Sequence, residues 1–164
     1  MTDTTEPLGE TLAHMQQVVT SFCRGVDRHD ADILASCYTP DATENHGIYA
    51  GSAAGFVDWV VGFLAQAGFM QHAVSNLHLL GMSGDTATTE TYYHVRCAGL
   101  DGELAHVFGR YLDTWRRHDG RWLIADRLCI LDWSSPNSGY SAADFENGAT
   151  DRTDPSYRFS QLVG

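Results

Sequence analysis

Two residues that lie far apart in the sequence could form a general base. Asp27 closes an amphipathic segment within CRGVDRHD, and His72 opens an apolar, alternating segment. A carboxylate that orients an imidazole makes a base that works near neutral pH. We expect the two side chains to approach within about 3.2 Å, or to meet through one water. The alternative for Asp27 is a surface pair with Arg24 or Arg28, and a lone strand histidine can be structural.

Arg127 is a third residue whose position predicts chemistry. It alternates with apolar neighbours along its strand, namely Leu123, Ala125, Cys129 and Leu131. An arginine in an apolar stripe is costly unless it meets a carboxylate or a polar ligand. Arg127 could bind Asp27, or a substrate carboxylate or enolate oxygen. The open alternative is a purely structural buried ion pair.

Further residues could line a substrate pocket. Aromatic side chains on the expected helices suit the wall around an apolar ring, namely Phe22, Phe56, Trp59 and Phe63. Several side chains could donate a proton to a leaving group, namely Tyr38, His46, Tyr92 and His94. On their strand Tyr92 and His94 share one face, and Tyr93 takes the other. By strand position Asp132 and Trp133 are expected near the pocket mouth, although Trp133 could also pack between subunits.

Helices are expected before strands along the chain. Apolar residues recur at helical steps from Leu12 to Val26. Asp30 can cap a second helix that carries Tyr38 and stops at Pro40, and residues 43–48 are expected to be extended. Ser52 can cap a third helix, which we expect to continue to Ala67 and to end at Gly68.

Four extended runs follow these helices, at residues 69–81, 86–98, 103–117 and 121–134. Short turns separate the runs, which predicts antiparallel hairpins. Helices followed by strands predict an α+β domain with three helices packed on a curved, mostly antiparallel sheet. We expect one domain over residues 1–164, with its core at about 8–134 and an ordered arm or a frayed tail at 135–164.

Composition excludes several functions. The 164-residue chain carries a net charge of −11, and its ten basic residues are all arginine. Without lysine there is no Schiff-base or P-loop chemistry, and an acidic chain is not expected to bind nucleic acid or an anionic membrane. The sequence lacks H-E-x-x-H and G-x-G-x-x-G, so we expect neither a metal nor an organic cofactor. Four isolated cysteines in apolar surroundings predict reduced core residues and a cytoplasmic protein.

The order of elements and three motifs carry a resemblance to a known family. The motifs are GVDRHD after the first helix, YTPDA after the second, and RRHDGRWLIADR near the last strand. From about Leu12 to Trp133 the chain resembles the SnoaL-like branch of the nuclear transport factor 2-like superfamily. It is most similar there to the group of scytalone dehydratase, lindane dehydrochlorinase and bile-acid 7α-dehydratase. That resemblance implies a cone-shaped α+β barrel, often a trimer, that eliminates water or HCl without a cofactor.

The resemblance also implies roles for individual residues. Asp27, His72 and Arg127, which follows Trp122 by five residues, match the functional positions of that group. One position departs, because Phe22 stands where the group often has a tyrosine or lysine that assists the leaving group. The chain is therefore expected to be a dehydratase-type lyase that acts on a small cyclic or polyketide-like substrate. The alternatives are an isomerase or cyclase with the same base, and a non-catalytic ligand-binding or assembly module. We expect a homo-oligomer, with a trimer before a dimer.

Overall fold

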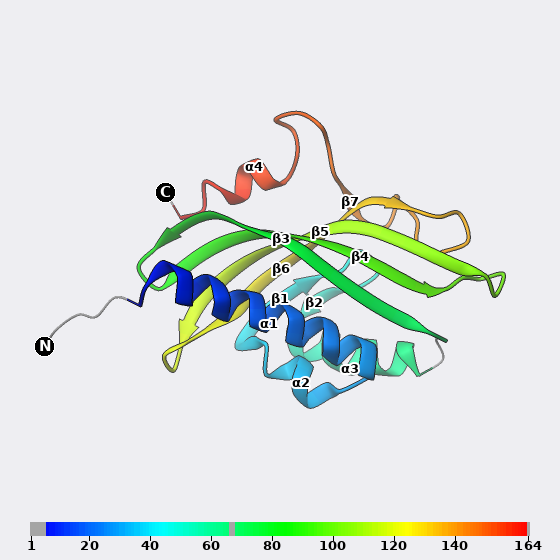
Figure 1. The fold of residues 1–164 in the computed structure, drawn as a ribbon, viewed down its shortest axis with the longest axis horizontal. Helices are drawn as coiled ribbons and strands as arrows, with labels where there is room; N and C mark the ends of the chain where they lie inside the picture. Colours follow the sequence, from blue (N-terminus) through cyan, green and yellow to red (C-terminus); the bar gives the residue numbers. More distant parts are fainter. Residues whose placement is uncertain (1–5, 66–67, 164) are drawn as a thin grey trace, which may run out of the picture.

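Three helices cover one face of a curved sheet (Figure 1). The computed structural model describes residues 6–65 and 68–163. Helix α1 (Leu8–Arg28) buries the predicted apolar stripe, including Met15, Val19 and Phe22, and ends at His29 in the left-handed conformation. This end brings Asp27 to the sheet. Among the described residues, no helix is long and apolar enough to cross a membrane.

Two shorter helices begin at the predicted caps. The Asp30 carboxylate accepts a hydrogen bond from the Ile33 amide at the start of α2 (Ala31–Ala35). The Ser52 hydroxyl accepts one from the Gly55 amide at the start of α3 (Ala53–Leu64). Each cap satisfies an amide that would otherwise lack a partner. The expected extension of the third helix to Ala67 is wrong at Ala65, where α3 has ended, and residues 66–67 lie outside the described residues.

The sheet is mixed, curled and not closed. Its strands follow the order β2-β1-β6-β5-β4-β3, with β7 paired to β6. The bounds are β1 (Tyr38–Asn45), β2 (Ala50–Ser52), β3 (Met70–Ser83), β4 (Thr86–Ala98), β5 (Leu104–His118), β6 (Arg121–Ser134) and β7 (Glu146–Asn147). The long strands pair antiparallel, as predicted, whereas β1 and β7 run parallel to β6. The α+β class is therefore confirmed, with an open cone in place of a closed barrel.

One local prediction was wrong, and one strand is irregular. Tyr38 does not end the second helix but begins β1, because α2 stops after five residues and the residue before Pro40 favours extended backbone. In β3, Asn76 adopts a positive φ of 51° and the register with β4 shifts between Ser75 and His78. This irregularity swaps the two faces of the strand, so Leu77 and Leu79 join the core in place of their neighbours.

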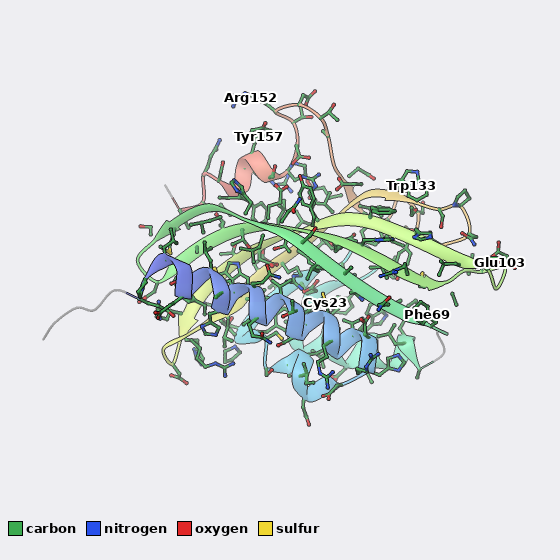
Figure 2. All side chains as sticks on the ribbon, in the orientation of Figure 1. Cys23, Phe69, Glu103, Trp133, Arg152 and Tyr157 are labelled. Carbon is green, nitrogen blue, oxygen red and sulfur yellow. The ribbon has the colours of Figure 1, made fainter. Side chains whose placement is uncertain are left out.

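The C-terminal arm is ordered and lies across the sheet from the three helices (Figure 1). Its short helix α4 (Ser156–Phe159) places Phe159 on an apolar cluster formed by Leu80, Leu112, Leu128 and Ile130. Asp154 accepts two hydrogen bonds from the buried Arg110 guanidinium, at 2.9 and 2.8 Å. The arm therefore seals part of the outer face of the sheet. Figure 2 shows Arg152 and Tyr157 of the arm on the side opposite Cys23 of α1.

Candidate functional site

Asp27 and His72 meet as predicted. His72 Nδ1 lies 2.7 Å from Asp27 Oδ1, and the His72 amide donates to both carboxylate oxygens at 3.1 and 3.0 Å. The Asp27 carboxylate is hydrogen-bonded to His72, and among the described residues it forms no ion pair with Arg24 or Arg28. Because an ionised carboxylate only accepts hydrogen bonds, Nδ1 carries the proton and Nε2 keeps its lone pair. This tautomer follows from the hydrogen bonding and makes Nε2 available as a base.

The dyad lies between a cavity and a surface groove. Only 5% of the His72 side chain and 12% of the Asp27 side chain are exposed. His72 lines both an inner cavity of the cone and a shallow groove between α1 and β3. Asp27 contacts only the groove. The His72 imidazole can therefore contact a molecule inside the cone, while the Asp27 carboxylate lies on the groove side.

The inner cavity is mostly apolar and has a few polar groups. The empty space between its walls is about 550 Å³, a figure that includes open solvent at the mouth. Helix α3 supplies an aromatic wall of Phe56, Trp59 and Phe63, three residues that the sequence placed in a pocket. The polar side chains on the walls are His46, His72, Tyr93, Tyr111 and Tyr140.

A wider vestibule continues from this cavity toward solvent. The two hollows share five lining residues, namely Ile48, Trp59, Phe63, Met70 and Tyr140. The vestibule also reaches the β4–β5 hairpin at Leu100 and the start of the C-terminal arm at Ser138. A ligand would thus pass between α3 and this hairpin before it meets His72.

Arg127 forms a buried ion pair and does not bind Asp27. Its Nε and Nη2 donate to Asp113 at 2.6 and 2.8 Å, and both side chains are fully buried. The guanidinium lies 4.2 Å from the ring centroids of both Phe22 and Tyr111. Burial opposes the charge, but the Asp113 carboxylate more than offsets this and raises the pKa of Arg127. Of the two predicted alternatives the structure therefore shows the ion pair, beneath the cavity wall.

Two predicted pocket residues lie behind the cavity wall. Phe22 is fully buried against Arg127 and Phe56, so its ring supports the site from beneath. Tyr38 donates a hydrogen bond of 2.5 Å to Glu44, which also accepts from His46 Nδ1 at 2.9 Å. Of this set, His46 is the residue that reaches the cavity.

Four other predicted pocket residues lie on the outer face of the sheet, so that prediction was wrong for Tyr92, His94, Asp132 and Trp133. Tyr93 and Val95 take the inner face with His72, which turns Tyr92 and His94 outward. His94 stacks on Phe108, and Trp133 packs against the same ring. Asp132 binds Arg110 through two hydrogen bonds, at 2.9 and 2.8 Å.

Sequence reasoning missed Glu44, Tyr111 and Tyr140. Tyr111 shares its strand face with Asp113 and Trp115, which are buried. The alternation of faces along this strand would have indicated that Tyr111 points into the core. Its hydroxyl forms no hydrogen bond within the described residues, and burial raises its pKa, so it stays protonated and can donate. Tyr140 comes from the arm, and no local pattern indicates its return to the cavity.

Metal ligands do not cluster in the part of the chain that the structure describes. No three side chains of histidine, cysteine, aspartate or glutamate lie close enough there to hold a metal ion. All four cysteines are buried and unpaired. Cys129 lines the cavity, and burial raises the pKa of its thiol to about 12, so it is not a thiolate nucleophile.

The sequence of this chain matches a known domain family. The model of the SnoaL-like domain matches residues 10–128. The chain belongs to the SnoaL-like family. No curated protein sequence matches this SnoaL-like chain.

Solved structures share the SnoaL-like fold. A type 2 hexachlorocyclohexane dehydrochlorinase, LinA, has a TM-score of 0.70 at 18% identity, over 80% of this chain and 91% of the other. A candidate scytalone dehydratase from Novosphingobium aromaticivorans has a TM-score of 0.73 at 14% identity, over 85% and 95%. A variant of Rv3472 from Mycobacterium tuberculosis, of unknown function, has a TM-score of 0.66 at 18% identity, over 93% and 96%. These likenesses show the fold.

Proposed function

We propose that this protein is a lyase of the dehydratase type that needs no cofactor. Its base is His72, which removes a proton from carbon next to an activating carbonyl. The observation that carries the proposal is the 2.7 Å contact between His72 Nδ1 and Asp27, which leaves Nε2 as the basic nitrogen of a ring that lines the cavity. Such a positioned base typically accelerates proton transfer by roughly 10²–10⁴-fold.

Asp27 has two roles in this proposal. It fixes the His72 tautomer, and its negative charge stabilises the imidazolium that forms when Nε2 takes the proton. Its additional bonds from the His72 amide hold the carboxylate in place. Arg127 is a positioning residue in our account, because it is fully buried and supports Tyr111 from behind the wall.

The cavity supports a small, largely apolar substrate. Aromatic rings from α3 can pack against a ring, while few polar groups are available to orient it. A cyclic or polyketide-like molecule with a hydroxyl two carbons from a ketone fits these surroundings. The names of two similar structures, a dehydrochlorinase and a candidate scytalone dehydratase, describe eliminations from ring compounds and support this class.

The experiment measures loss of water from a panel of cyclic 3-hydroxyketones by mass spectrometry. We expect the wild-type protein to form the enone and His72→Gln to lose roughly 10²–10⁴-fold in rate. His118→Gln is the matched control, because His118 faces Asp119 at 3.6 Å on the surface. Equal rates for wild type and His72→Gln would overturn the proposed base.

An isomerase or cyclase would use the same dyad and remains the second candidate. It needs proton abstraction without a leaving group, so its product keeps the mass of the substrate. A product of unchanged mass that depends on His72 would favour this candidate. Ligand binding that His72→Gln leaves unchanged, with no turnover, would favour a binding module.

A further inference from the structure

A second histidine–carboxylate pair lies on the wall of the same cavity. His46, just after β1, contacts Glu44 through Nδ1 at 2.9 Å, and 20% of its side chain is exposed. Its ring packs against Phe56 and Tyr111, with centroids 5.1 and 6.3 Å away. Because Nδ1 is held by Glu44, Nε2 is the nitrogen left for a cavity ligand.

Both carboxylate oxygens of Glu44 have a hydrogen-bond partner. Oε2 accepts from the Tyr38 hydroxyl at 2.5 Å, and Oε1 faces His46 Nδ1. Burial, and then the charge of Glu44, raise the pKa of Tyr38, so this hydroxyl keeps its proton and donates. A carboxylate that receives a donor on each oxygen is in its acceptor form.

Acidic side chains outnumber the arginines around Glu44 and His46. Glu44 and Asp113 are both fully buried, and the cation nearest to them in the sheet is Arg127, which is the register partner of Glu44. Arg127 already donates two hydrogen bonds to Asp113. Two buried carboxylates with one guanidinium leave one negative charge uncompensated, which is costly at this depth. A positive charge on the cavity wall would balance it.

We propose that His46 is the general acid that protonates the leaving group, and that the substrate therefore loses a hydroxyl. This inference rests on the proposed role of His72 as base. Glu44 and Tyr38 are positioning residues that hold the His46 ring. The pair also accounts for Phe22, since proton donation comes from another residue of the cavity wall.

The step balances within the protein and the substrate. Nε2 of His72 takes the proton from carbon, and the electron pair of that C–H bond becomes the new C=C bond. The C–O bond breaks, and the oxygen takes both its electrons and the proton from His46 Nε2 to leave as water. His72 is then protonated and His46 neutral, and proton exchange with solvent restores both.

The leaving group decides whether this acid is needed. Hydroxide is a strong base and leaves carbon readily only when it is protonated, whereas chloride is a weak base and leaves without a proton. A dedicated acid is therefore expected for loss of water. It would contribute little to loss of HCl.

The test compares two probes that differ only in the leaving group, a cyclic 3-hydroxyketone and the matching 3-chloroketone. We expect His46→Gln to slow loss of water by roughly 10²–10⁴-fold and to leave enzymatic loss of HCl, corrected for the uncatalysed reaction, near the wild-type rate. Glu44→Gln and Tyr38→Phe should follow the same pattern with smaller losses. His72→Gln should slow both eliminations.

The outcomes separate the two proposals. If His46→Gln slows both probes equally or neither, His46 is not the acid, while the His72 base can stand. Elimination that is independent of His72, or no elimination from either probe, overturns both. Nitrogen-15 NMR of labelled histidines needs no substrate, and His46→Gln assigns the signal. Two protonated nitrogens on His46 at neutral pH are expected, and a neutral ring overturns the inference.

Discussion

Histidines and arginines have different partners on the two faces of the sheet. On the inner face, His72 and His46 each contact a carboxylate and line a cavity. On the outer face, His94 Nε2 lies 2.9 Å from His106 Nδ1, and the pair stacks beside Phe108. Burial, and then the neighbouring His106, lower the pKa of His94, so that ring is neutral at neutral pH. The partner of a histidine therefore separates a candidate base from a packing residue.

The two buried arginines show the same contrast. Arg127 on the inner face has a single acidic partner, Asp113, and aromatic rings on both sides. Arg110 on the outer face binds Asp132 and Asp154 and lies 3.7 Å from Glu90. The inner arginine supports the cavity wall. The outer arginine fastens the C-terminal arm to the sheet.

Asp27→Asn is expected to have the largest effect on the inner face. An amide can donate to Nδ1 and favour the tautomer whose Nε2 carries the proton, which removes the base without changing its position. We expect proton abstraction to fall by roughly 10²–10⁴-fold with little change in thermal stability. Elimination kinetics and thermal unfolding measure the two quantities, and an unchanged rate would contradict the assigned tautomer.

Arg127→Ala is expected to cause the largest loss of stability. It leaves the Asp113 carboxylate buried without its partner, which typically costs about 3–5 kcal/mol. The free energy of unfolding from urea titration checks this value. Arg127→Ala combined with Asp113→Ala should recover part of the loss, and a double variant less stable than the single one would contradict the ion-pair account.

A smaller, pH-dependent effect is expected at the arm. Burial disfavours the Asp154 charge, but the hydrogen bonds from Arg110 and Ser156 outweigh it and lower its pKa below the usual value. Asp154 therefore adds stability above the unfolded pKa of about 4, and this contribution is lost as the pH falls further. Asp154→Asn should flatten the decline of the unfolding free energy below about pH 4. An equally steep decline of the unfolding free energy in Asp154→Asn would contradict the proposed link between Asp154 ionisation and stability.

His94→Ala is expected to have the smallest effect on chemistry. Its ring lies on the outer face against Phe108, so the elimination rate should stay close to that of the wild-type protein. Steady-state kinetics with the 3-hydroxyketone panel measure this. A loss as large as that of His72→Gln would mean that the outer face carries the site.

Sequence patterns predicted the features that depend on regular helices and strands. Caps at Asp30 and Ser52, the four long strands and the meeting of Asp27 with His72 all follow from periodicity, turn residues and the family resemblance. The family and the fold class are confirmed. The irregularity of β3 at Asn76 could not be predicted, because a single positive-φ residue exchanges the faces of a strand and leaves no clear trace in the hydrophobic pattern.

Partners across the fold could not be predicted. The pairing of Arg127 with Asp113 depends on which strands are neighbours in the sheet and in which register. The return of Tyr140 to the cavity depends on the path of the arm. Oligomeric state and cellular location stay predictions.

The most direct test of the central claim is hydrogen exchange without a leaving group. The parent cyclic ketone of the 3-hydroxyketone probe is incubated in D₂O, and loss of its α-hydrogen signal is followed by proton NMR. We predict that the wild-type protein and His46→Gln catalyse the exchange at similar rates, whereas His72→Gln is slower by roughly 10²–10⁴-fold. Exchange by His72→Gln at the wild-type rate would contradict the assignment of His72 as the base.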